Sequence, residues 1–140
     1  MRYFLASVGL CVALLHAQGL SGATEVFFAR DRKALMPVVT AEKASPGVVK
    51  AAETLAGYLK KISGGEFAVE KGDGTSGIAV GLAGDFASLP PGPGLDASPS
   101  ASGDEYLIRS HPKGVCLAGA SETAVEFAVW DFLHRLGYRQ

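Results

Sequence analysis

The sequence predicts an α/β (α+β) domain in which a mixed β-sheet carries two amphipathic helices on one face. Two segments repeat apolar residues every three or four positions, and several short segments are rich in β-branched and aromatic residues. These segments follow one another in the order β-β-α-β-β-loop-β-β-α, and such a chain buries its apolar faces by packing the helices on the sheet. The length, 140 residues, suits a single domain.

Residues 1–23 have the features of a secretory signal peptide. Met1-Arg2 is followed by an apolar run from Phe4 to Leu15, and Ser21-Gly22-Ala23 forms a small-x-small cleavage site. The apolar run is shorter than the about 20 residues that a membrane-spanning helix needs. We therefore expect no membrane anchor, and a secreted or periplasmic protein whose mature domain covers residues 24–140.

The first half of this domain is predicted to form two strands and a helix. The strands are expected at 24–28 and 37–41, on either side of the charged turn at 30–33. Ser45 is an N-cap residue before a proline, and Gly64-Gly65 can end the helix with a positive φ. Between them lies an apolar stripe of Val48, Ala52, Leu55, Leu59 and Ile62.

Two further extended runs follow this helix. Phe67 and Val69 alternate with polar residues, a turn follows at 72–74, and the run at 77–81 predicts either a hairpin or two neighbouring strands. The segment 88–103 is rich in proline, glycine and serine. Such a composition cannot bury a core, so we expect a long surface loop within one domain.

The last part of the chain predicts a β-hairpin and a second helix. The strands at 105–109 and 115–118 flank a proline-glycine turn at 111–114. The helix begins near Ser121 and ends at Gly137. Its apolar face is expected to hold Val125, Ala128, Val129, Phe132, Leu133 and Leu136.

Charge and cysteine content exclude several classes of function. The 13 basic and 14 acidic residues are interspersed and leave a net charge of −1, which argues against nucleic-acid binding and against polybasic membrane docking. Removal of residues 1–23 would leave Cys116 as the sole thiol. Its place in an apolar run favours a buried, inert thiol over a reactive one.

The residues provide no catalytic, metal or cofactor constellation. The glycines at 77, 81 and 84 lack the spacing of a dinucleotide fingerprint, and no Walker lysine follows them. Asp104 and Glu105 are adjacent strand residues, so their side chains point to opposite faces. Asp131 and His134 could share a metal, but an ion pair at the surface of the helix is favoured. No cofactor is expected.

Aromatic residues near the C-terminus provide the candidate contact site. Phe127, Trp130 and Tyr138 could form a sugar-stacking platform, although packing within the domain is the commoner role for such residues. An aromatic edge left uncovered would instead suit an interdomain contact that includes Arg139.

Four parts of the chain match a known sequence pattern: AETLAGYLKKISG at 52–64, IAVG at 78–81, EYLIR at 105–109 with GVCLAG at 114–119, and AVWDFLHRLGYR at 128–139. Together these segments resemble the N-terminal domain that precedes the catalytic barrel in secreted α-glucuronidase-like glycoside hydrolases. A similar accessory domain precedes the barrel of β-N-acetylhexosaminidases, so the resemblance implies a mixed sheet with two helices.

The resemblance implies an accessory role in polysaccharide degradation, because the catalytic carboxylates of the family lie in the barrel, beyond residue 140. Three hypotheses follow. In the first, the chain is a non-catalytic fragment of such an enzyme. In the second, it is a stand-alone carbohydrate-binding module that uses Trp130, Phe127 and Tyr138. In the third, the domain packs against a barrel, in cis or on a separate chain, through residues near Tyr138 and Arg139.

Overall fold

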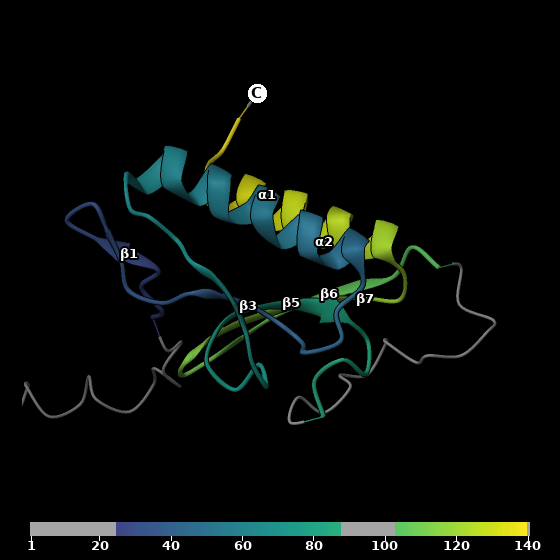
Figure 1. Ribbon diagram of the computed structural model, residues 1–140. Helices are drawn as coiled ribbons and strands as arrows, with labels where there is room; N and C mark the ends of the chain where they lie inside the picture. Colours follow the sequence, from purple (N-terminus) through teal and green to yellow (C-terminus); the bar gives the residue numbers. More distant parts are fainter. Residues whose placement is uncertain (1–24, 88–102, 140) are drawn as a thin grey trace, which may run out of the picture.

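The computed structural model describes residues 25–87 and 103–139, and shows two helices on one face of a five-stranded sheet (Figure 1). The strand order is β4-β3-β5-β7-β6, with β6 antiparallel to β7 and all other neighbours parallel. The predicted fold class is therefore confirmed. The strands are β3 (Val38–Thr40), β4 (Val69–Lys71), β5 (Gly77–Leu82), β6 (Tyr106–His111) and β7 (Gly114–Gly119).

Helix α1 (Pro46–Ser63) forms where the sequence predicts it. The Ser45 hydroxyl accepts a hydrogen bond from the Val48 amide at 3.5 Å, which satisfies one of the free N–H groups of the first turn. Gly64 ends the helix with a φ of +77°, and its N–H donates to the Lys60 carbonyl at 2.8 Å. The predicted stripe is buried except for Ile62, which is 43% exposed at the last turn.

Helix α2 (Glu122–Arg135) also begins at its predicted cap. The Ser121 hydroxyl accepts a hydrogen bond from the Ala124 amide at 3.1 Å, which caps the helix. The same hydroxyl donates to the Gly103 carbonyl and so connects the start of α2 to the segment before β6. The predicted apolar face is buried from Val125 to Leu133, whereas Leu136 lies beyond the helix and is partly exposed.

The predicted hairpin forms from β6 and β7, with Pro112-Lys113 as its turn and His111 paired with Gly114. Gly114 also pairs with Gly77 of the neighbouring parallel strand. A β-carbon on Gly114 would lie 1.9 Å from the Gly77 carbonyl oxygen, so the two backbones can approach only because this residue is glycine. The glycines of this region therefore serve backbone packing.

The strand predicted at 24–28 is wrong in position. Directly after the predicted range, a short antiparallel hairpin forms from β1 (Ala29–Arg30) and β2 (Lys33–Ala34), with its turn at Asp31-Arg32. Both turn residues have positive φ, 51° and 61°, as a two-residue hairpin with the native twist requires. Phe28 instead packs its ring edge against Phe132 of α2, with centroids 5.4 Å apart.

The predicted pairing after α1 is also wrong. β4 and β5 are neither a hairpin nor neighbours, because β3 lies between them and is parallel to both. Val38 pairs with Val69 on one side and Ile78 on the other. The buried strand β3 needs a hydrogen-bonding neighbour on each side. The chain that follows α1 supplies these two neighbours as β4 and β5, which the short loop at 72–76 connects.

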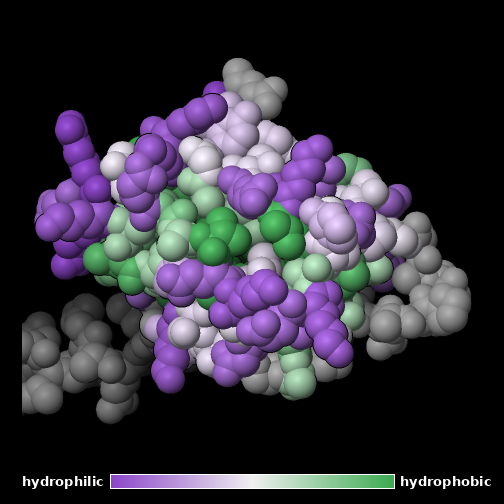
Figure 2. Space-filling view, in the orientation of Figure 1, coloured by the Kyte–Doolittle hydropathy of each residue, from purple (hydrophilic) through white to green (hydrophobic). Residues whose placement is uncertain are grey.

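The main core lies between the helices and the sheet, and a smaller one covers the opposite face. Figure 2 shows a band of apolar residues, bordered by hydrophilic ones, at the level where helices and sheet meet. Cys116 lies buried in the smaller core, as predicted, and burial raises the pKa of its thiol to about 11. The smaller core consists of Val39, Ala41, Ala79, Phe86, Cys116 and Ala118.

Two predicted segments lie outside the described residues: the signal peptide at 1–23 and, apart from Gly103, the loop at 88–103. Within 25–87 and 103–139, neither helix is long and apolar enough to cross a membrane.

Candidate functional site

The outer face of the helix layer carries a cluster of three aromatic rings. The Tyr58 ring of α1 lies 5.0 Å from the Trp130 ring of α2 and 4.8 Å from the Tyr138 ring, each at an interplanar angle of 66°. The Trp130 and Tyr138 rings are 6.5 Å apart. Such edge-to-face contacts hold the rings in fixed orientations. We call Tyr58, Trp130 and Tyr138 the aromatic patch.

The backbone after α2 places Tyr138 in this patch. Gly137 has a φ of +92°, its N–H donates to the His134 carbonyl, and the Tyr138 N–H donates to the Leu133 carbonyl. These two bonds form a Schellman motif, which turns the chain back over the last turn of the helix. Tyr138 is thereby held against α1 instead of extending away from the domain.

The patch has a basic rim. The Lys61 ammonium lies 4.5 Å from the centre of the Tyr58 ring, a cation–π contact. An open hollow of about 390 Å³ is lined by Trp130, His134, Tyr138 and Arg139. Removal from water raises the pKa of the Tyr138 hydroxyl, and the adjacent Tyr58 hydroxyl raises it further. Because its rim is basic, the patch suits a partner surface that is acidic or apolar better than one that is basic.

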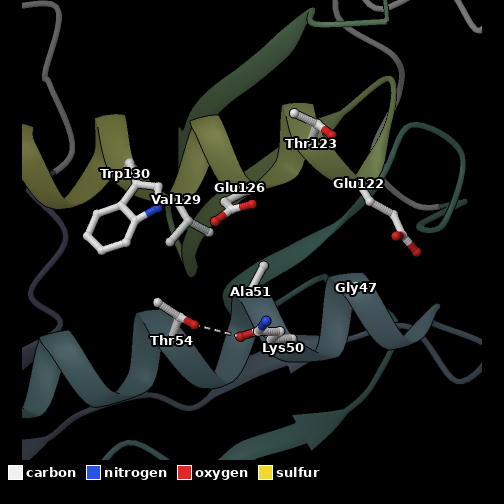
Figure 3. Close-up of a pocket in the computed structure, with 9 residues that line it drawn as sticks. All are labelled: Gly47, Lys50, Ala51, Thr54, Glu122, Thr123, Glu126, Val129 and Trp130. Atoms are coloured by element: carbon white, nitrogen blue, oxygen red, sulfur yellow. Dashed lines mark hydrogen bonds between the residues drawn. The ribbon is translucent and has the colours of Figure 1, made fainter.

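A second hollow, the interhelix groove, runs between α1 and α2 toward their N-terminal ends (Figure 3). Its volume is about 250 Å³. Glu122, Glu126 and Trp130 extend from α2 toward α1 in Figure 3, and Ala51 and Val129 form an apolar floor. The remaining lining residues are Gly47, Lys50, Thr54 and Thr123.

The structure brings three of the four predicted contact residues together. Trp130 and Tyr138 touch, and Arg139 lines the same hollow. Phe127 is 47% exposed and has no ring contact within the described part of the chain. It lies one turn before Asp131 on α2.

Sequence reasoning missed Tyr58, which joins the patch from the other helix. Tyr58 follows Lys50 and Thr54 at intervals of four residues, so all three share one stripe of α1. That spacing could have placed Tyr58 beside the groove residues, but only with the knowledge that α1 and α2 are parallel neighbours.

Asp131 forms the ion pair predicted for this helix, but with a different partner. Its carboxylate accepts from the Arg135 guanidinium at 2.9 Å and from the Tyr106 hydroxyl of β6 at 3.2 Å. The Arg135 hydrogen bond lowers the pKa of the Asp131 carboxyl, and the Tyr106 hydrogen bond lowers it further. His134 instead lines the open hollow. Among the residues that the structure describes, no three potential ligands gather to hold a metal.

No family model matches the chain, and no curated protein matches it. Among solved structures, it is similar to a GH138 enzyme targeting pectin rhamnogalacturonan II, with a TM-score of 0.52 and 13% identity over 74% of this chain. It is also similar to a GH115 4-O-methyl-α-glucuronidase with specificity for decorated arabinogalactans, with a TM-score of 0.51 and 17% identity over 76%.

The chain has a fold found within large glycoside hydrolases. It covers only 10% of the GH138 chain and 14% of the GH115 chain, so the likeness concerns one domain of each. At these identities the likeness describes the fold, and the activity of the neighbours is a matter for proposal.

Proposed function

We propose that this domain is the non-catalytic N-terminal part of a secreted α-glucuronidase-like glycoside hydrolase that acts in polysaccharide degradation. The observation that carries the proposal is the fold match to one small part of two glycoside hydrolases, one of which is an α-glucuronidase. Cleavage of a glycosidic bond needs two carboxyl groups on either side of the sugar. Glu122 and Glu126 both belong to the α2 wall of the groove, so they are not placed to flank a bond.

The aromatic patch and Arg139 are the proposed docking surface for a catalytic barrel. The patch is a rigid cluster on an outer face, and aromatic residues with arginine are typical of the centres of protein interfaces. Any polypeptide that continues beyond residue 139 would leave the domain directly beside Tyr138. A barrel that follows in the chain would therefore meet this surface first.

Export is part of the same proposal. Residues 1–23 carry the charged start, apolar run and small-residue site of a secretory signal peptide. An export assay with 1–23 fused to a reporter should release a reporter cleaved after Ala23. A reporter that stays uncleaved in the cell would contradict secretion.

The docking role is tested by reading the gene beyond the codon for Gln140 and expressing any longer product. Trp130→Ala and Tyr138→Ala should make the longer enzyme easier to cleave by protease between the domain and the barrel. Phe27→Ala, which removes an exposed aromatic ring elsewhere, is the matched control. Release of glucuronic acid from polysaccharide by the 140-residue chain alone would contradict the non-catalytic role.

A second candidate function is a stand-alone secreted carbohydrate-binding module. It is favoured by the part of the aromatic patch that lines the open hollow, because sugar rings pack their apolar faces on such side chains. Calorimetric titration with xylan and chitin oligomers tests it. Flat titrations would contradict sugar binding, and a stop codon directly after Gln140 would contradict docking to a barrel in the same chain.

A further inference from the structure

We propose that the interhelix groove binds one ring of a neutral saccharide. The inference does not depend on the docking role, because most of the groove lies toward the N-terminal ends of the helices and the docking surface lies toward their C-terminal ends. Trp130 is the residue that borders both.

The shape of the groove suits a single sugar ring. Its floor is apolar, since Ala51 and Val129 are only 6% and 1% exposed. The contact between the Tyr58 and Trp130 rings, 5.0 Å apart, marks one end. A volume of about 250 Å³ lies below the ~300–1,000 Å³ of pockets for drug-sized ligands. The groove therefore has room for one ring beside Trp130.

The walls carry polar groups of both kinds that a sugar hydroxyl can use. Glu122 and Glu126 follow each other at an interval of four residues on α2, and Lys50 lines the groove from α1. Within the described residues, no hydrogen bond or ion pair occupies the Lys50 ammonium, either carboxylate or the Trp130 indole N–H. A hydroxyl both donates and accepts, so it can bond to a carboxylate and to an ammonium or indole at once.

The charge of the groove selects a neutral sugar. Two carboxylates and one ammonium line the groove, which leaves one unit of negative charge along its walls. A uronic acid would bring a further carboxylate into this field, and like charges at such distances repel. A neutral sugar avoids the repulsion and gains charge-assisted hydrogen bonds from its hydroxyls to the carboxylates.

The chain provides its own reporter for the test, because Trp130 is its sole tryptophan. Titration of the 140-residue protein with xylose, galactose, arabinose and their short oligomers should change the tryptophan fluorescence to saturation for at least one of them. For so small a ligand we expect a dissociation constant on the order of 1 mM. Glucuronic acid at neutral pH should bind at least about tenfold more weakly.

Matched variants locate the site. Glu126→Gln keeps the size of the side chain but removes its charge, and should weaken binding about tenfold. Glu70→Gln, the same change on the exposed edge strand β4, should leave the dissociation constant unchanged. Equal affinity in the Glu126→Gln variant would show that the sugar binds elsewhere and would overturn the proposal.

Amide NMR of the unmodified protein gives an independent measurement, should Glu126→Gln fail to fold. Sugar addition should shift the amides of 50–54 and 122–126 and leave those of β4 in place. No shift with any neutral sugar at 50 times the expected dissociation constant, about 50 mM, would overturn the proposal, as would tighter binding of glucuronic acid. Neither result bears on the protease assay, so the docking role stands or falls separately.

Discussion

Burial determines the chemistry of Cys116. The thiol lies in the smaller core, and desolvation raises its pKa to about 11, an effect that the charge of Arg109 only partly offsets. At pH 8 about one thiol in a thousand is then ionised, and the thiolate is the reactive form. We expect iodoacetamide at pH 8 to label Cys116 slowly in the folded protein and rapidly in guanidinium, as measured by peptide mass spectrometry. Equal rates in both would show that the thiol is accessible.

Position 114 requires glycine, because the backbone of the neighbouring strand lies close to it. A β-carbon there would lie 1.9 Å from the Gly77 carbonyl oxygen, and the φ of +153° disfavours other residues. Gly114→Ala should therefore lower the free energy of unfolding by about 3 kcal/mol, because β5 and β7 must move apart. Urea denaturation measures the change. Gly57→Ala on α1 is the control. A β-carbon at this position would have no atom within 4 Å, so the substitution should stabilise the protein by up to about 1 kcal/mol.

At the scale of elements, Asp131 links α2 to the edge strand β6. The Arg135 hydrogen bond holds the pKa of its carboxyl below the ordinary value, and the Tyr106 hydroxyl adds to this. A depressed folded-state pKa stabilises the protein above the unfolded value near 4, and the contribution is lost as the pH falls through the folded value. Asp131→Asn should thus cost about 0.5–1 kcal/mol at pH 7 and almost nothing at pH 2.

Urea denaturation at both pH values checks this dependence. Asp104→Asn is the matched control, since Asp104 is exposed and precedes β6. A loss of stability for Asp131→Asn that persists unchanged at pH 2 would assign the effect to packing and not to the ionised carboxylate.

The elements that the sequence predicts correctly are those specified by neighbouring residues. Ser45 and Ser121 mark helix starts, and their hydroxyls do cap α1 and α2. The hairpin turn at Pro112-Lys113 is local in the same sense. The partners of β3 are not specified locally, because β4 and β5 pair with it through residues that are distant in the sequence. A period of two residues identifies a strand but does not choose its neighbour.

At the scale of the whole molecule, the candidate site follows from the parallel arrangement of α1 and α2. Trp130 and Tyr138 are close in sequence, and their proximity could be predicted from the helix ending at Gly137. Tyr58 and Lys50 reach the patch and the groove from a helix that ends almost sixty residues before α2 begins. No local pattern contains that pairing, since it depends on β3, β5 and β7 being parallel neighbours in the sheet.

This shared arrangement also predicts how the domain unfolds. Leu133 of α2 and Leu55 of α1 are fully buried in one core with Ile78 and Leu117 of the sheet. Neither helix can leave without exposing that core, so helix and sheet should unfold in one transition. Circular dichroism and Trp130 fluorescence should therefore report the same urea midpoint.

Substitution in the core should move that single transition. Leu133→Ala should lower the free energy of unfolding by about 3 kcal/mol and shift both signals together, because it leaves a cavity between helices and sheet. Leu35→Ala, the same change at a side chain 52% exposed, should alter it by less than about 0.5 kcal/mol. If Trp130 fluorescence changed at a lower urea concentration than the circular dichroism, α2 would unfold separately. The aromatic patch and the groove would then be lost while the sheet remained.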